Sequence, residues 1–257
     1  MRLTIDDSRI TRLICYHSRM SPLENLGLED LRAHAVKTFR RGGGSRPAVL
    51  LVRVNGEQAV LKDYSQADPW FRRVVGPLSV RREARALKQL AGARGVPRLL
   101  RVVNRDALLL EYIPGTSARE VPPGGLTPPF FERFYRLVDR LHEFGVAHCD
   151  LRSEGNILVG ADGEPHAVDF TAHFRRGRRW NPLSRWMYDK FCEADRVAVA
   201  RLKKSHAPDL LTDAEQQALA RDRKTWLERT ARFIGKSVRH ISRWLLTRPD
   251  KSGPDRD

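Results

Sequence analysis

A short predicted hairpin with polar residues at both ends constrains the fold of this chain more than any other stretch. Apolar runs at 157–159 and 166–168 flank the turn Ala161–Glu164, a pattern typical of two antiparallel strands. Asn156 precedes the hairpin and Asp169 follows it. Because the two ends of a hairpin lie close together, we expect Asn156 and Asp169 to share one site. Their oxygen atoms are the ligands that Mg²⁺ prefers.

A third polar residue, Asp150, stands six positions before Asn156, in the segment His148-Cys149-Asp150. A carboxylate beside a magnesium site can orient a hydroxyl group that attacks a phosphate. The stretch therefore predicts magnesium-dependent phosphoryl transfer, provided that the rest of the chain supplies an ATP site.

The region before it reads as three antiparallel strands at 35–40, 48–54 and 58–64, with Asn55-Gly56 as a hairpin turn. Gly42, Gly43 and Gly44 stand in the first turn, where a backbone without side chains can approach phosphates; a flexible turn explains them equally well. Lys62 lies near the end of the third strand. After a break at Gly76-Pro77, a helix over 79–90 carries Glu83 beside its apolar stripe. Glu83 either pairs with Lys62 or lies at the surface among arginines.

The remaining pattern predicts strands at 99–103 and 107–111, a connection rich in proline and glycine at 121–129, and a helix over 130–144 whose aromatic residues form core. A further helix is expected over 183–204, with Asp195 and Arg196 as a buried pair, and another helical region begins at Thr212.

Composition limits the partners and the compartment. The net charge of +16 favours anionic partners such as nucleotide, nucleic acid, acidic glycolipid or a membrane surface. The three widely spaced cysteines predict no disulfide framework and hence a reducing compartment. We expect no signal peptide and no membrane-spanning helix. The protein should therefore be cytoplasmic, and any contact with the membrane should be peripheral, at its inner face.

At this point the motifs resemble a known family. Their order along the chain is similar to that of the eukaryotic-like protein-kinase fold. The matching motifs are Ala59-Val60-Leu61-Lys62, Glu83, Glu111-Tyr112-Ile113, His148-Cys149-Asp150, Asn156 and Asp169-Phe170. The pattern is most similar to the small bacterial and RIO-like branch, and within it to the lipopolysaccharide core (Kdo/heptose) kinases. The resemblance covers about residues 33–205. It implies an α+β, two-lobed fold: a small antiparallel sheet with one helix, then a mostly helical lobe.

The resemblance also implies roles for single residues. Asp150, Lys62 and Arg152 would be catalytic, with Arg152 placed where protein-serine kinases have a lysine that contacts the transferred phosphate. ATP would be bound by Gly42, Gly43, Gly44, Lys62, Glu83, Glu111 and Ile113. Mg²⁺ would be held by Asn156 and Asp169.

The chain also departs from the family pattern. Cys149 replaces the arginine that couples to a phosphorylated activation loop, so we expect no such regulation. Thr171 replaces a glycine, the glycine-rich turn lacks alternating glycines, and the loop from Asp150 to Asn156 is one residue longer than usual.

Two basic regions bear on the acceptor. Arg175, Arg176, Arg178 and Arg179 follow the metal motif without an intervening acid, which suits an anionic acceptor, although a solvated loop or a nucleic-acid patch would look alike. Residues 226–246 are amphipathic and basic, as expected of an interfacial helix on an anionic bilayer or of a helix docked on the second lobe. We divide the chain into an extension (1–32), two lobes (33–114 and 115–210), the basic helical region (211–248) and a disordered tail (249–257).

Three functions follow. The first is a kinase that phosphorylates a sugar hydroxyl of the lipopolysaccharide core; the second is a RIO-like protein serine/threonine kinase. The third is a non-catalytic basic binding protein, and retention of Lys62, Asp150 and Asp169 argues against it. Nucleic acid is not the expected partner.

Overall fold

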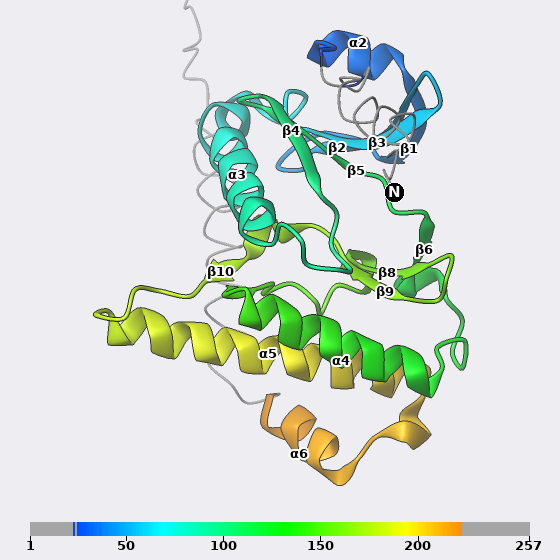
Figure 1. The fold of residues 1–257 in the computed structure, drawn as a ribbon, viewed down its shortest axis with the longest axis vertical. Helices are drawn as coiled ribbons and strands as arrows, with labels where there is room; N and C mark the ends of the chain where they lie inside the picture. Colours follow the sequence, from blue (N-terminus) through cyan, green and yellow to red (C-terminus); the bar gives the residue numbers. More distant parts are fainter. Residues whose placement is uncertain (1–22, 24, 223–257) are drawn as a thin grey trace, which may run out of the picture.

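The N-terminal half of the molecule is built on a five-stranded antiparallel sheet with strand order β1-β2-β3-β5-β4. The structure is a computed structural model that describes residue 23 and residues 25–222 (Figure 1). The predicted strands are confirmed to within one residue at each end, as β1 (Ala35–Arg40), β2 (Ala48–Val54), β3 (Glu57–Asp63), β4 (Leu99–Asn104) and β5 (Ala107–Glu111).

The predicted hairpin turn between β2 and β3 is confirmed. Val54 pairs with Glu57, and Asn55 and Gly56 between them have φ angles of 50° and 87°. A two-residue turn with positive φ at both positions matches the right-handed twist of the strands. This turn fixes the register of β3 and therefore the face on which each of its side chains lies.

Helix α3 (Pro69–Gln89) is longer than predicted, because Gly76-Pro77 does not break it. A proline inside a helix removes the hydrogen bond to the carbonyl four residues earlier, here that of Arg73. That carbonyl instead accepts a hydrogen bond from the Arg105 guanidinium at 3.2 Å. Gly76 packs on Tyr64, where an added Cβ would lie 3.3 Å from the Tyr64 Cβ. The hydrogen bond from Arg105 and the close packing of Gly76 on Tyr64 therefore allow the helix to continue through the predicted break.

The two faces of the sheet are covered by different helices. On one face, Val80 and Leu87 of α3 share an apolar cluster with Leu108 and Leu110. On the other, Leu31 of the short helix α2 (Leu28–Ala33) packs with the alternate residues of the strands, Val52, Ala59, Leu61 and Leu109. Helix α2 falls within the predicted extension and completes this half of the fold.

The C-terminal half is mostly helical, as Figure 1 shows, with α4 (Pro128–Glu143) and α5 (Pro182–His206) packed side by side and α6 (Asp213–Asp222) after them. Two small antiparallel sheets lie between these helices and the N-terminal half: β6 (Gly115–Ser117), β8 (Ile157–Gly160) and β9 (Pro165–Ala167) form one, and β7 (Val146–Ala147) and β10 (Phe174–Arg175) the other. The predicted hairpin at 157–168 is confirmed as β8 and β9.

One predicted pair in this half is wrong. Arg196 does not pair with Asp195 but with Asp139 at the surface, at 2.8 Å, while Asp195 is buried. Adjacent residues on a helix point about 100° apart, and here Asp195 points into the core while Arg196 points to solvent.

Several sequence predictions lie outside the described residues: the interfacial helix at 226–246, the tail at 249–257 and most of the extension at 1–32. Within residues 25–222, no helix is long and apolar enough to cross a bilayer.

Candidate active site

A cavity of about 440 Å³ lies between the five-stranded sheet and the β8–β9 hairpin. Val60 and Leu110 contribute apolar walls from the sheet, and Leu158 and Val168 contribute them from the hairpin side. A slot with apolar walls on two sides and a polar end suits a flat aromatic base with a charged extension. A second cavity, of about 500 Å³ between α4 and β9, contains none of the predicted site residues.

Lys62 enters this cavity because side chains alternate along β3. Ala59 and Leu61 face α2, so Val60 and Lys62 face α3. Glu83, one helical position from the buried Ala84, meets Lys62, and their Nζ and Oε2 atoms are 2.6 Å apart. Both side chains are buried, with 3% and 1% of their surface exposed. Of the two alternatives that the sequence left open for Glu83, the structure has the pair with Lys62.

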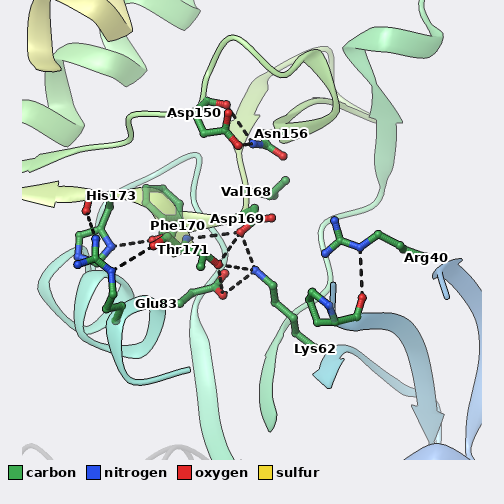
Figure 2. Close-up of polar contacts among 12 residues, drawn as sticks. Arg40, Lys62, Glu83, Asp150, Asn156, Val168, Asp169, Phe170, Thr171 and His173 are labelled. Atoms are coloured by element: carbon green, nitrogen blue, oxygen red, sulfur yellow. Dashed lines mark hydrogen bonds and ion pairs between the residues drawn. The ribbon is translucent and has the colours of Figure 1, made fainter. Parts of the chain in front are cut away.

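Asp169 and Thr171 complete the cluster around the Lys62 ammonium. Its Nζ lies 2.6 Å from Asp169 Oδ1 and 3.0 Å from Thr171 Oγ1 (Figure 2). The Thr171 hydroxyl also lies 2.7 Å from Asp169 Oδ1 and 3.1 Å from Glu83 Oε2. Thr171 therefore contacts every charged member of the cluster. In the sequence, Thr171 stood out only as a replacement for the glycine of the family pattern.

The charges in the cluster stabilise one another. Burial alone would lower the pKa of Lys62, but the carboxylates of Glu83 and Asp169 raise it above its ordinary value. Burial alone would raise the pKa of Asp169, but the Lys62 ammonium and the Thr171 hydroxyl hold it well below its usual range. Lys62 is thus an ammonium and Asp169 a carboxylate at neutral pH.

Asp150 and Asn156 lie on the opposite side of the site (Figure 2). Asn156 Nδ2 donates to Asp150 Oδ2 at 2.9 Å and to the Asp150 carbonyl at 3.0 Å. Burial raises the pKa of Asp150, which makes its carboxylate a stronger base. The loop ends in the 3₁₀ turn η3 (Glu154–Asn156).

Asp195 holds the loop in front of Asp150. Its carboxylate accepts hydrogen bonds from the backbone amides of His148, at 2.7 Å, and Cys149, at 2.9 Å. Cys149 has a φ of 67°, a conformation that costs energy in a non-glycine residue and that the surrounding contacts must maintain. His148 Nε2 donates in turn to the Val168 carbonyl at 3.0 Å, which ties the loop to the residue before Asp169.

Sequence reasoning missed this role of Asp195, although a signal was present. Buried residues of α5 recur at helical spacing, at Tyr188, Cys192, Asp195, Val199 and Leu202. An acid within an apolar stripe needs a buried partner, and here the partners are two backbone amides and the His142 ring, whose Nε2 lies 3.2 Å from Asp195 Oδ2.

The predicted ATP-binding residues divide into two groups. Lys62, Glu83, Glu111 and Ile113 line the cavity, as do the predicted metal ligands Asn156 and Asp169. Gly42, Gly43 and Gly44 lie in the β1–β2 connection and are not among the lining residues; the Gly44 carbonyl accepts from the Asp68 amide at 2.9 Å. Their contact with phosphate stays a prediction.

Arg40, two residues before these glycines, lines the cavity instead. Its guanidinium donates to the Pro47 carbonyl at 3.2 Å and contributes to the low pKa of Asp169. Sequence reasoning missed this cation, because an arginine at the end of a strand has no local pattern that distinguishes a cavity from solvent.

Asp150 does not itself line the cavity and lies beside it, hydrogen-bonded to the lining residue Asn156; the remaining predicted residues do not line it either. The Arg152 guanidinium contacts both carboxylate oxygens of Asp222 in α6, at 2.5 and 2.6 Å. Arg176 donates to the His142 carbonyl at 2.9 Å and lies over the Tyr188 ring. Arg175, Arg178 and Arg179 are exposed. The catalytic role of Arg152 and the acceptor role of the four arginines stay predictions.

The donor set fits magnesium rather than a metal with an all-protein cage. Among residues 25–222, no group of three or more His, Cys, Asp or Glu side chains is placed to hold a metal ion. Mg²⁺ in phosphotransferases is bound through one or two carboxylates together with substrate phosphates. The carboxylate of Asp169 and the amide oxygen of Asn156 provide such a partial set at the edge of one cavity.

Comparison with known proteins gives the fold. No family model and no curated protein matches the chain. Among solved structures it is similar to the Rio2 kinase from Chaetomium thermophilum, with 17% identity over 82% of this chain and 75% of that chain, and a TM-score of 0.54. The Rio2 kinase–ADP/Mg²⁺–phosphoaspartate complex from the same organism has 18% identity over 82% of this chain and 74% of that chain, with a TM-score of 0.52. The fold is protein-kinase-like. The resemblance to lipopolysaccharide core kinases is not supported by these matches.

Proposed function

We propose that this protein is an ATP- and magnesium-dependent phosphotransferase with a hydroxyl group as acceptor. The observation that carries the proposal is the buried cluster of Lys62, Glu83 and Asp169, which opens into an apolar slot opposite Asp150. A buried lysine fixed by a carboxylate is a device for holding phosphates, and a metal-binding aspartate beside it completes the electrostatics of phosphoryl transfer. That a neighbour of the same fold is solved with ADP and Mg²⁺ supports the choice of ligands.

In this proposal each residue has a task. The adenine base would lie between Val60 and Leu110 on one side and Leu158 and Val168 on the other, with its edge at Glu111 and Ile113. Lys62 would bind the phosphates through its ammonium, and Glu83 would keep that ammonium in place. Asp169 and Asn156 would hold Mg²⁺, which offsets the negative charge of the phosphates when bound.

Asp150 would act on the acceptor. Its half-buried carboxylate, oriented by the Asn156 amide, accepts the hydrogen of the acceptor hydroxyl. The hydroxyl oxygen then forms a bond to the γ-phosphorus while the bond from that phosphorus to the β–γ bridging oxygen breaks, and ADP leaves with the electron pair. Burial raises the pKa of Asp150, which favours proton acceptance.

For the acceptor we propose a sugar hydroxyl of an anionic glycolipid, of the lipopolysaccharide core class. The support is the exposed basic segment that contains Arg175, Arg178 and Arg179 and directly follows Asp169-Phe170, since guanidinium groups bind carboxylates and phosphates bidentately. Such an acceptor would place the protein in the cytoplasm, at the inner face of the membrane. A protein serine or threonine is the second candidate, favoured by the similarity to Rio2 kinases, and would use the same residues.

The test uses purified full-length protein, radiolabelled ATP and Mg²⁺, with core glycolipid and total protein offered as separate acceptors. Label in the glycolipid supports the first acceptor, and label only in protein replaces it with the second. Asp150→Ala should abolish transfer and leave the ATP dissociation constant, measured by calorimetry, within a few-fold of the wild type. Near-wild-type turnover by Asp150→Ala would refute the assignment of Asp150. A wild-type protein that does not bind ATP would refute the proposal as a whole.

A further inference from the structure

The turn and helix end after β10 expose an unusual group of large apolar side chains. Trp180, Leu183 and Trp186 are 74%, 65% and 50% exposed, and the first two are the most exposed large apolar side chains among the described residues. Figure 1 shows the segment between β10 and α5 projecting beyond the rest of the fold at the N-terminal end of α5. Single exposed apolar residues are ordinary, but a cluster on a projection marks an interaction surface.

The same projection is strongly basic. Residues 170–188 contain five arginines and no aspartate or glutamate. All five are exposed. Arg176 is held by the His142 carbonyl and the Tyr188 ring, whereas Arg175, Arg178, Arg179 and Arg185 form no ion pair within residues 25–222. We call these four arginines together with Trp180, Leu183 and Trp186 the basic aromatic tip.

We propose that the basic aromatic tip docks on an anionic lipid bilayer, with Trp180, Leu183 and Trp186 in the interfacial layer and the arginines at the lipid phosphates. Tryptophan favours the boundary between headgroups and acyl chains, because its ring is apolar and its N–H is polar. Each basic residue close to an anionic membrane surface strengthens binding about fivefold. Both contributions come from one projection, so they act together.

Other occupants match the tip less well. In a symmetric contact between two copies, the arginines of one tip would face those of the other, and like charges repel. Residues 223–257 of the chain are themselves net basic, so their charge does not complement the tip. Single-stranded nucleic acid stacks on aromatic rings that line a groove, whereas these side chains stand on a projection and include the aliphatic Leu183.

The tip is connected to the candidate active site. It follows β10, in which Phe174 pairs with Ala147, and Ala147 lies three residues before Asp150. With a lipid-linked acceptor, a bilayer bound at the tip would therefore be joined to the Asp150 loop through the short β7–β10 pair. Only this last step rests on the proposed function; lipid docking itself does not require catalysis.

The experiment measures partition of the full chain onto phosphatidylcholine vesicles prepared with and without phosphatidylglycerol. We expect binding that depends on the anionic lipid and weakens with salt. The triple variant Trp180→Ser/Leu183→Ser/Trp186→Ser should lower the partition coefficient at least tenfold. The double variant Arg178→Gln/Arg179→Gln should lower it about 25-fold, because each lost arginine weakens binding about fivefold. The matched controls Val74→Ser/Leu78→Ser and Arg81→Gln/Arg85→Gln change exposed residues of α3 and should partition as the wild type does.

Thermal denaturation and ATP affinity check that the tip variants are folded, and the single variant Trp180→Ser gives a milder change. Loss of vesicle binding with ATP affinity retained separates this inference from the proposed function. Wild-type partition by the triple tip variant would overturn the inference. So would a dimer that dissociates when the tip is altered, which would assign the tip to a second copy, or an oligonucleotide that binds with the same tryptophan dependence.

Discussion

The hydroxyl of Thr171 should contribute measurable stability, and its removal tests the geometry of the buried cluster without knowledge of the acceptor. Thr171→Val keeps the shape of the side chain and deletes Oγ1. That atom accepts from the Lys62 ammonium at 3.0 Å. Its single hydrogen can be donated to only one carboxylate, and the shorter distance, 2.7 Å to Asp169 against 3.1 Å to Glu83, favours Asp169.

The magnitude follows from the charges of the partners. A hydrogen bond to a charged group contributes about 1.5–3 kcal/mol to stability. Lys62 keeps two carboxylates after the substitution, so the lower part of the range applies, and we expect a loss of about 2 kcal/mol. In a protein of this size that corresponds to a fall in the melting temperature of roughly 4–8 °C.

The assay is thermal and urea denaturation of the protein without nucleotide. Thr171→Ser restores the hydroxyl and should recover most of the loss, while Thr116→Val, at an exposed position of β6, controls for the exchange of a hydroxyl for a methyl group. Wild-type stability in Thr171→Val, or an equal loss in Thr171→Ser, would refute the cluster as described.

Three further predictions concern other parts of the site. Burial lowers the pKa of His173 to about 4. The neutral ring therefore stabilises the fold fully above the unfolded pKa near 6.5, and this stability is lost as the pH falls towards 4. Between pH 7 and pH 5, urea denaturation should show the wild type losing up to about 2 kcal/mol more than His173→Asn, whose amide can replace the donor to the Phe170 carbonyl. Asp195→Asn keeps an oxygen for only one of the amides of His148 and Cys149 and turns a donor towards the other, so it should cost about 3 kcal/mol in the same assay. Asp139→Asn, in a surface pair with Arg196, should cost under about 1 kcal/mol; equal losses would contradict the buried role of Asp195. Arg152→Gln and Asp222→Asn should be coupled in a double-mutant cycle by more than about 0.5 kcal/mol, and strict additivity would show that their contact does not form in solution.

The parts of the site that the sequence predicted are those with a local periodic signal. Turn chemistry at Asn55-Gly56 fixed the strand that carries Lys62, and helical periodicity put Glu83 beside an apolar stripe; the choice of Lys62 as the partner of Glu83 came from the family resemblance. The hairpin brought Asn156 and Asp169 to one cavity for the same reason: its ends are close whatever the rest of the chain does.

The parts that the sequence did not predict depend on contacts between distant segments. Asp195 binds amides 46 and 47 residues away, and Arg152 meets Asp222 across 70 residues. No periodic pattern records such pairs. Helix α3 passes Pro77 because Arg105, 32 residues from Arg73, supplies the missing donor. The break predicted at Gly76-Pro77 is wrong, because tertiary contacts continue the helix through it.

The charges of the buried cluster explain why the proposed reaction would need a divalent cation. One ammonium, that of Lys62, faces two carboxylates, those of Glu83 and Asp169, so the cluster carries a net charge of −1. The other charged residues of the cavity lining are Lys37, Arg40 and Arg119 against Glu111 and Glu120, so the lining as a whole is neutral and has no excess positive charge for a triphosphate. In addition, the Asp169 carboxylate would repel the phosphates that Lys62 attracts. A cation at Asp169 and Asn156 turns that repulsion into attraction, and this is the physical reason for placing Mg²⁺ there rather than assigning the phosphates to Lys62 alone.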